Sequence, residues 1–535
     1  MFKRAQWDRF SKHISKKYNL RIPKKRNLTI TEVDSLLLKI NEYIVDAIET
    51  CIPRFKPKDN TLNYVNNKIT KSKLVTIIKQ MKRQGYTDES PLVTRVRNVL
   101  NRMNEMLKSE FKCTYLKYWA KEHQAIDYKV ADSFFPKINK FFRPKNSIDI
   151  QNLHTHDINL LTRCGIDPGG LEKVEGKYVV AEAEEKRKLM GAFYERVNSP
   201  RYTNIGTQTK QKVDTVMSNF KRIFENYRSQ NKTILQFSEN NPAHSPADTL
   251  IEGSPYFCKT QTIIKIFQKL PNKTSTGIDN IPPIVLKHMP LQLYIEYTAL
   301  FNNALNHCYF PKRWKEVKIL PIPKKGKEPH DPSSHRPLSL TPSIGKAYEI
   351  AWSPCLKFWT KRNKVIPNEQ FGFENKHSTT HAVNKLTSDI NKSLNNNLMV
   401  GACLIDLDKA FDSVWLDGLI YTLLETKYLF PLVLLIYDMI TGRSFAIWDG
   451  TSLSEMIFLL LEGLGQGTVS SPPLFNIYTR EVLTLKLENR YIKEHKLKVG
   501  RLAFADDFIV YISGRDPEIP GSPTIPSRAG LLKES

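Results

Sequence analysis

Residues 501–512 read RLAFADDFIVYI, a strand-like run that contains two adjacent aspartates, Asp506 and Asp507. The apolar and aromatic residues on either side favour a pleated, half-buried surface. A carboxylate in such a setting costs several kcal/mol unless a cation or another partner offsets its charge. A hairpin turn is the other interpretation, because aspartate tolerates tight turns, although FADDF lacks the glycine or asparagine typical of them. From this stretch alone, metal binding and a plain turn remain open in equal measure.

A second group of carboxylates lies one hundred residues earlier, in GACLIDLDKAFDSVWLDGL at 401–419. An apolar strand runs directly into Asp406. If that strand lies beside the hairpin of Asp506 and Asp507, three carboxylates converge and require cations. Ligands that are all oxygen select Mg²⁺ or Mn²⁺ over zinc. Such a site can hold two ions roughly 3.5–4 Å apart and catalyse phosphoryl transfer.

Three further aspartates follow in the same stretch. Asp406 and Asp408 would share one face of an extended strand. However, DKAFDSVWLDGLIYTLLE has helical spacing, so we interpret Asp408, Asp412 and Asp417 as residues at the start of a helix.

The whole chain is strongly basic, with 80 Lys and Arg against 54 Asp and Glu among its 535 residues. Residues 1–150 alone hold 32 basic and 15 acidic side chains. A localised positive field of this size suits a polyanionic partner, most simply nucleic acid, although a solvated surface is the alternative. Together with a two-metal carboxylate site, this charge indicates nucleotidyl transfer or nucleic-acid hydrolysis. At 41% hydrophobic residues, the composition excludes a disordered chain.

Cysteines and apolar segments exclude several other classes of protein. The seven cysteines are scattered without a CxxC pair, so we expect a reducing compartment and neither a zinc ribbon nor a disulfide framework. The HTHD stretch at 154–157 lacks further ligands and is not interpreted as a metal site. The N-terminus has no apolar signal region, and the longest apolar run, 428–440, is too short to span a bilayer. We expect an intracellular protein with no membrane partner and no evident oligomer.

The residue composition and the spacing of apolar residues change along the chain. Residues 1–237 read as a mostly helical, basic region, since segments such as VDSLLLKINEYIVDAIET space their apolar residues at three and four. Residues 238–256 are rich in Ser, Asn and Pro and are interpreted as a linker. Beyond 256 the pattern is mixed α/β. Residues 514–535 are rich in Pro, Gly and Ser and are expected to be a disordered tail.

Six motifs in order resemble those of the reverse transcriptases of jockey-like, non-LTR (LINE-type) retrotransposons. The motifs are KTSTGIDNIPPIVLK (273–287), WKEVKILPIPKKGKEPHDPSSHRPLSL (314–340), EQFGFENKHSTTHAV (369–383), LIDLDKAFDSVW (404–415), GLGQGTVSSPPLFNIY (463–478) and FADD (504–507). The resemblance implies an α/β (α+β) right-hand polymerase, with fingers at 257–400 and an incomplete palm at 401–513. It also implies an RNA template, a DNA primer and deoxynucleoside triphosphates as substrates.

The resemblance also implies roles for individual residues. Asp406, Asp506 and Asp507 would be catalytic and would bind two Mg²⁺ ions, with Mn²⁺ as a substitute. Phe411 would lie under the sugar and exclude a 2′-OH, although its spacing also suits a core aromatic. Lys324 and Arg336 would grip the triphosphate, which suits a point charge and a guanidinium fork. Gln466 and Gly467 would pack against nucleotide and template, since glycine permits close backbone approach.

The chain departs from the family pattern at four positions. Gly465 replaces a usual Pro, Ser471 a usual Gly, Pro473 a usual aliphatic residue, and Glu374 a common Arg. Pro473 predicts a helix that begins late or is kinked. We expect the chain to lack the endonuclease and the thumb of such elements and therefore to be a weak polymerase. A catalytically dead remnant that binds nucleic acid and a two-metal nuclease are the competing functions.

Overall fold

The structure is a computed structural model that describes residues 6–17, 28–52, 90, 92–102, 150–200, 207–233, 258–272, 275–324, 326–407, 409–485 and 497–514, with the isolated residues 74, 78, 81 and 492. It divides into two units, one of residues 1–5 with 52–147 and one of residues 6–51 with 148–535. In the first unit, residues 92–102 are helical, as the sequence predicts for this segment. The expected linker at 238–256 and the expected tail beyond Gly514 lie outside the described residues.

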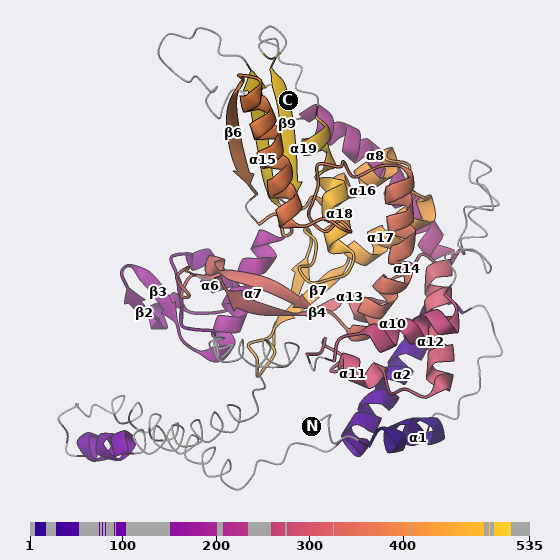
Figure 1. Ribbon diagram of the computed structural model, residues 1–535. Coiled ribbons are helices and arrows are strands. Elements are labelled where there is room, and N and C mark those ends of the chain that lie inside the picture. Colours follow the sequence, from indigo (N-terminus) through magenta and orange to yellow (C-terminus); the bar gives the residue numbers. More distant parts are fainter. Residues whose placement is uncertain are drawn as a thin grey trace, which may run out of the picture. The chain divides into compact units, whose positions relative to one another are not determined.

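Helices supply most of the second unit (Figure 1). The apolar residues of α2 recur every three or four positions and are buried, so this helix buries one face. The helices are α1 (Trp7–Lys17), α2 (Ile30–Cys51), α6 (Ile158–Arg163), α7 (Ala183–Val197), α8 (Thr207–Ser229), α10 (Thr260–Lys269), α11 (Pro283–Leu286), α12 (Leu291–Asn306), α13 (Lys312–Lys315), α14 (Ser343–Arg362), α15 (Thr379–Asn395), α16 (Leu416–Glu425), α17 (Phe430–Ile440), α18 (Ser471–Tyr478) and α19 (Arg480–Thr484), with short 3₁₀ turns η2 (Pro168–Gly170) and η5 (Pro332–Ser334).

Within the described residues, three separate sheets accompany these helices. The first has the order β1-β3-β2, the second β5-β4-β7-β8 and the third β6-β10-β9. We call the second the framework sheet and the third the aspartate sheet. Their strands are β1 (Leu153–Thr155), β2 (Glu172–Val174), β3 (Lys177–Val180), β4 (Glu316–Pro323), β5 (His335–Leu340), β6 (Met399–Asp406), β7 (Arg443–Ile447), β8 (Phe458–Leu460), β9 (Lys498–Phe504) and β10 (Asp507–Gly514).

The framework sheet lies in a deeply buried core. Strand β4 runs parallel to β7 and antiparallel to β5, and five of its eight residues in a row are buried. One hydrophobic cluster joins Val317 and Ile319 of β4 to β7, β8 and α7. The same cluster includes Leu153 of β1 and Leu160 of α6. Buried residues between 150 and 197 therefore pack with the framework sheet.

The stretch that was expected to be mostly helical also contains strands. Residues 153–180 form the three short antiparallel strands β1, β3 and β2. Asp157, from the HTHD motif, caps α6 through a hydrogen bond that its carboxylate accepts from the Leu160 N–H at 3.0 Å. A strand of three or four residues carries too short an alternation to be separated from helical patterning.

A buried ionic cluster connects α8, α13 and α17. Asp438 of α17 lies 3.0 Å from Lys315 and 3.0 Å from Arg228, and it accepts a hydrogen bond from the Phe310 N–H at 2.6 Å. Burial lowers the pKa of Lys315, and Asp438 opposes that shift. Because both charged partners are largely removed from water, their positions depend on this carboxylate.

The aspartate sheet is much less covered. Helix α15 lies against it (Figure 1), and the Tyr511 hydroxyl of β10 donates a hydrogen bond to Asp389 of α15. None of the residues of α15 or β6 is buried. Leu404 of β6 is 75% exposed, and within the described residues β6 has a strand neighbour, β10, on one side only.

Two sequence predictions on cysteines and membrane segments can be compared with the structure. Six cysteines lie in the described residues and are free, five of them buried and Cys403 exposed. Among the helices that the structure describes, none combines the length and apolar character that crossing a membrane requires.

Candidate functional site

The two carboxylate-bearing strands predicted to be neighbours do lie side by side. Strand β10 pairs antiparallel with β6 over eight positions, and Asp507 is the direct register partner of Asp406. Directly paired residues of an antiparallel ladder project from the same face of a sheet. Asp406 and Asp507 are both exposed at this end of the sheet.

Asp506 occupies a tight turn, which is the hairpin that the sequence analysis gave as one of two interpretations of FADD. Phe504 pairs with Asp507, which leaves Ala505 and Asp506 as the two connecting residues between β9 and β10. Ala505 has a φ of 59°, in the left-handed region that residues with a Cβ rarely adopt. The turn therefore forms without the glycine or asparagine that this geometry favours.

The donor chemistry of this site fits a hard divalent cation. Asp406 and Asp507 supply two carboxylates on one face, with Asp506 as the adjacent residue in the turn. Carboxylate oxygens are the ligands that Mg²⁺ and Mn²⁺ prefer. Among the described residues, no group of three or more His, Cys, Asp or Glu side chains is gathered closely enough to hold a metal. Of the three carboxylates expected to converge, Asp406 and Asp507 lie opposite each other, and Asp506 is the residue next to Asp507 in the turn.

Phe411 follows β6 and packs against aromatic rings. Its ring stacks on Phe475 of α18, with centroids 4.5 Å apart and an interplanar angle of 19°. Phe373 meets it edge-on at 6.1 Å. Phe411 stays half-buried, so one part of the ring belongs to a packed aromatic cluster and another part is accessible to solvent.

Lys324 and Arg336 lie near the ends of the paired strands β4 and β5. Arg336 pairs with Ile322 across the ladder and is exposed. The Lys324 backbone N–H donates to the Ser334 carbonyl at 2.7 Å, and its ammonium donates to the Ser333 carbonyl at 3.0 Å. The structure therefore brings the two cations to the same end of one hairpin.

Gln466 is held by a residue that the sequence analysis assigned to a helix start. Its side-chain nitrogen donates to both carboxylate oxygens of Asp412, at 3.1 and 3.0 Å. Asp412 is buried, and burial raises its pKa to about 6, while the Gln466 hydrogen bond and the charges of Lys409 and Lys324 oppose the shift. The assignment of Asp412 to a helix start is wrong, because α16 begins at Leu416 and Asp412 is buried before it.

The other two aspartates of that group have different outcomes. Asp417 lies in the first turn of α16, as predicted, and pairs with Lys221 of α8 at 2.7 Å. Asp408 lies outside the described residues.

The loop that contains Gln466 is fixed from several sides. The Leu464 N–H donates to the Phe411 carbonyl at 2.7 Å, and the Ser339 N–H donates to the Gln466 carbonyl at 2.9 Å. Gly467 has a φ of 103°, and a Cβ there would lie 3.2 Å from the Ser339 carbonyl oxygen. Glycine is required at 467 for both reasons, and the close approach is to strand β5.

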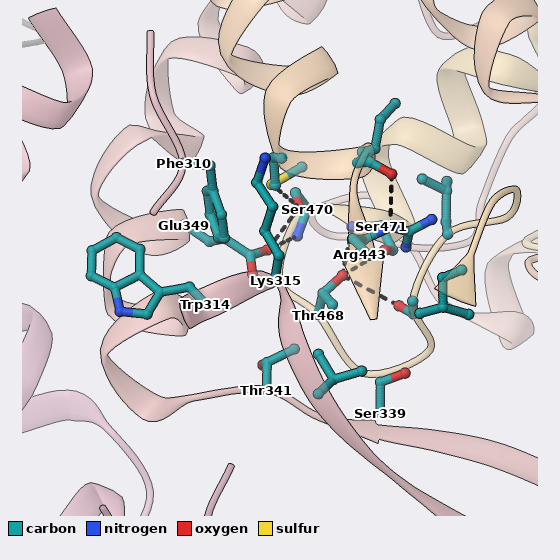
Figure 2. A pocket seen from close by; sticks show the side chains of 16 residues that line it. Phe310, Trp314, Lys315, Ser339, Thr341, Glu349, Arg443, Thr468, Ser470 and Ser471 are labelled. Carbon is teal, nitrogen blue, oxygen red and sulfur yellow. Dashed lines mark hydrogen bonds between the residues drawn. The ribbon is translucent and has the colours of Figure 1, made fainter. Parts of the chain in front are cut away.

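Glu349 of α14 anchors the next part of this loop. Its carboxylate accepts hydrogen bonds from the N–H groups of Val469 and Ser470 at 3.0 Å and from the Ser470 hydroxyl at 2.7 Å. Burial raises its pKa, and these hydrogen bonds oppose the shift. Figure 2 shows Glu349 and Ser470 in a pocket that Arg443, Lys315 and Ser339 also line. This pocket lies beneath the loop, and the paired aspartates do not line it.

The substitutions at 473 and 374 are accommodated locally. Helix α18 begins at Ser471, so Pro472 and Pro473 occupy its first turn, where a missing N–H costs little. The late start expected from Pro473 is not seen. Glu374 accepts a hydrogen bond from the Asn476 side chain at 3.2 Å, and burial raises its pKa.

The segment 369–372 contacts the aspartate hairpin directly, although its motif was assigned to the fingers. The Phe371 N–H donates to the Ala503 carbonyl at 2.8 Å, and the Ala503 N–H donates to the Glu369 carbonyl at 2.9 Å. This contact joins residues more than 130 positions apart, and no local sequence pattern indicates it.

Part of the chain is similar in sequence to a known protein family and to known proteins. Residues 322–524 match the family described as reverse transcriptase (RNA-dependent DNA polymerase). The chain is 32% identical over 257 residues to the probable RNA-directed DNA polymerase from transposon BS of Drosophila melanogaster, covering 48% of this chain and 28% of that protein. It is also 32% identical over 227 residues to the RNA-directed DNA polymerase from mobile element jockey of Drosophila melanogaster, covering 42% of this chain and 24% of that protein.

The matched region is therefore about a quarter of the length of these relatives. A solved structure of apo telomerase from Candida tropicalis, truncated from the C-terminal domain, is 11% identical, with a TM-score of 0.29, and the match covers 61% of this chain and 84% of that one. That score is too low to support an argument about the fold.

Proposed function

We propose that the chain adds deoxynucleotides to a primer 3′-OH on an RNA template, because residues 322–524 match the reverse transcriptase family and the chain is similar to the RNA-directed DNA polymerases of transposon BS and mobile element jockey. In this proposal, residues 257–400 act as polymerase fingers and residues 401–513 as part of the palm. The observation that carries the proposal is the register pairing of Asp406 with Asp507, next to Asp506 in a tight turn.

The three aspartates would hold the divalent cations. The chemistry that bound Mg²⁺ supplies in such reactions is activation of the 3′-OH and stabilisation of the leaving pyrophosphate. Asp406, Asp506 and Asp507 lie at an exposed or half-exposed end of the aspartate sheet, which a duplex and a nucleotide can reach. An exposed carboxylate pair also repels itself, so binding a cation relieves like-charge repulsion.

Four residues would position the nucleotide. Lys324 and Arg336 would bind the triphosphate, as a strongly hydrated ammonium and a guanidinium fork can. Phe411, supported on Phe475, would present a rigid ring edge to the sugar and exclude a 2′-OH. Gln466 would contact nucleotide or template, with its side-chain nitrogen already bound to Asp412.

The test compares Asp406→Asn and Asp507→Asn with Asp417→Asn, a matched carboxylate in the first turn of α16. The first two variants should weaken Mn²⁺ binding and abolish nucleotide addition on an RNA template, whereas Asp417→Asn should do neither. Equal losses at all three positions would refute the assignment. Release of nucleotides from the template without any addition would identify a nuclease instead.

A further inference from the structure

The turn that carries Asp506 depends on one buried glutamine from a distant segment. Gln370 is 1% exposed and lies beside β9, where it forms an isolated parallel bridge with Ala503. Its side-chain oxygen accepts hydrogen bonds from the Ala505 N–H at 3.1 Å and the Gly372 N–H at 2.8 Å. Its side-chain nitrogen donates to the Ala505 carbonyl at 3.4 Å. Both amide atoms therefore bind the backbone of Ala505.

These bonds fall on a residue with an unfavourable backbone conformation. Ala505 has a φ of 59°, which brings its Cβ close to the following carbonyl oxygen. Hairpin turns of two residues normally place asparagine or glycine at such positions, and the sequence offers Ala505 and Asp506 instead. Local sequence thus does not specify this turn, and contacts from outside the hairpin must hold it.

The backbone of the same segment also touches the turn. A Cβ on Gly372 would lie 2.0 Å from the Ala505 nitrogen and 2.7 Å from its Cα, so no side chain fits there. The Gly372 carbonyl accepts a hydrogen bond from the Asn476 side chain of α18 at 2.8 Å. The segment is therefore anchored to α18 on one side and to the turn on the other.

We propose that Gln370 is a positioning residue that holds the Ala505–Asp506 turn, so that Asp506 and Asp507 are presented beside Asp406. The inference rests on the proposed function, because it takes these aspartates as the cation-binding residues. Gln370 itself touches neither the substrate nor the cation. Its contribution is to hold Ala505 at a positive φ, a backbone conformation that alanine would not keep without these hydrogen bonds.

The decisive experiment is a rescue in the full chain, with Mn²⁺ binding followed by the electron paramagnetic resonance signal of the free ion. Gln370→Ala should weaken Mn²⁺ binding by about five-fold or more. The reason is that the turn carrying Asp506 and Asp507 loses the side chain that holds it. Adding Ala505→Gly should restore the affinity to within about two-fold, because glycine adopts a positive φ freely. Ala505→Gly alone should bind Mn²⁺ like the parent.

A merely structural role predicts a different result. Loss of a buried amide leaves the Ala505 N–H without its acceptor, so Gln370→Ala should also lower thermal stability. Ala505→Gly cannot restore that hydrogen bond, so the double variant should regain Mn²⁺ affinity but only the part of the stability that comes from relieving the positive φ. Gln268→Ala is the matched control, since Gln268 is exposed on α10 and donates to the Lys287 carbonyl at 3.0 Å. It should change neither quantity.

Asp406→Asn separates failure of this inference from failure of the proposed function. If Asp406→Asn leaves Mn²⁺ binding intact, the cation site itself is wrong. If Asp406→Asn weakens binding but folded Gln370→Ala binds like the parent, the positioning role is wrong. If Gln370→Ala weakens Mn²⁺ binding and the added Ala505→Gly does not restore it, the positioning role is also wrong. Should Gln370→Ala not fold, Gln370→Asn, which keeps a buried amide but is one methylene too short to reach Ala505, is measured in its place.

Discussion

The framework sheet and the aspartate sheet differ in how far they are removed from water. In the framework sheet, Ile319 of β4 is 2% exposed and belongs to the hydrophobic cluster that also includes residues of α7. In the aspartate sheet, no residue of β6 is buried, and Leu404 is 75% exposed. The residues assigned to cation binding thus lie on a sheet that is less buried than the framework sheet.

This difference means that the buried framework sheet contributes more to stability, while the proposed functional residues lie on the more exposed aspartate sheet. Carboxylates that must meet a cation and a polyanion stay charged most easily where they remain hydrated. Their geometry then has to come from the rigid parts of the fold, through contacts such as those of Gln370 with Ala505.

The largest effect is expected from Asp438→Ala, in the ionic cluster next to the framework sheet. The variant leaves Lys315 and Arg228 without their shared carboxylate in a buried setting. Removing one partner of a buried ion pair costs about 3–5 kcal/mol of unfolding free energy. Denaturant unfolding measures this cost. Asp389→Ala, which removes a half-exposed carboxylate bound to Lys385 and Tyr511 at the aspartate sheet, should cost clearly less.

A matched pair of truncations compares the sheets directly. Ile319→Ala on β4 should lower the unfolding free energy by about 2–5 kcal/mol, because it opens a cavity in a packed core. Leu404→Ala on β6 should change it by less than about 0.5 kcal/mol, since an exposed side chain loses little burial. Both are read from urea unfolding curves with unchanged slopes. Similar costs for the two variants would mean that β6 is covered in solution.

The sequence indicated the two carboxylate-bearing strands, because apolar strands that end in carboxylates are a local pattern. It gave their pairing only as a condition, which the structure meets. It also predicted that Asp417 begins a helix. It was not sufficient for Asp412, whose spacing fits a helix start equally well and whose burial depends on Gln466, 54 positions away. The role of Gln370 was not predicted for the same reason. A single glutamine has no recognisable pattern, and its partner Ala505 lies 135 positions away.

The third prediction concerns Glu296, a buried acid of helix α12. Glu296 is 2% exposed, and burial raises its pKa to about 7. A folded-state pKa above the unfolded value means that stability is present at low pH and is lost as pH rises from about 4.5 to about 7. Glu296→Gln should therefore raise the unfolding free energy at about pH 8 by roughly 3 kcal/mol and change it little at about pH 4.

The control for this prediction is Glu455→Gln, because the Glu455 side chain is 80% exposed. Thermal unfolding of both variants and the parent across this pH range gives the comparison. A Glu296→Gln variant whose stability gain is the same at low and high pH would show that packing, and not ionisation, sets the effect.

The smallest effect is expected from Asp412→Asn, beneath the Gln466 loop. An ionised carboxylate only accepts hydrogen bonds, so Asp412 forces the Gln466 nitrogen inward and leaves its oxygen for a ligand. Asparagine can donate as well as accept, so both amide orientations become possible. Loss of about 1 kcal/mol of preorganisation corresponds to about five-fold weaker deoxynucleotide binding.

The pH dependence of nucleotide binding tests this explanation of the Asp412→Asn effect. Burial raises the pKa of Asp412 to about 6, against the opposing charges of Lys409, Lys324 and Arg443, while Tyr194 also lies nearby. Below about pH 6 the protonated Asp412 can donate too, so parent and variant should converge there and separate above it. Ser413→Ala, at an exposed neighbouring position, should follow the parent at every pH. A constant difference between parent and Asp412→Asn would assign the effect to lost packing, and the orientation of Gln466 would then need another cause.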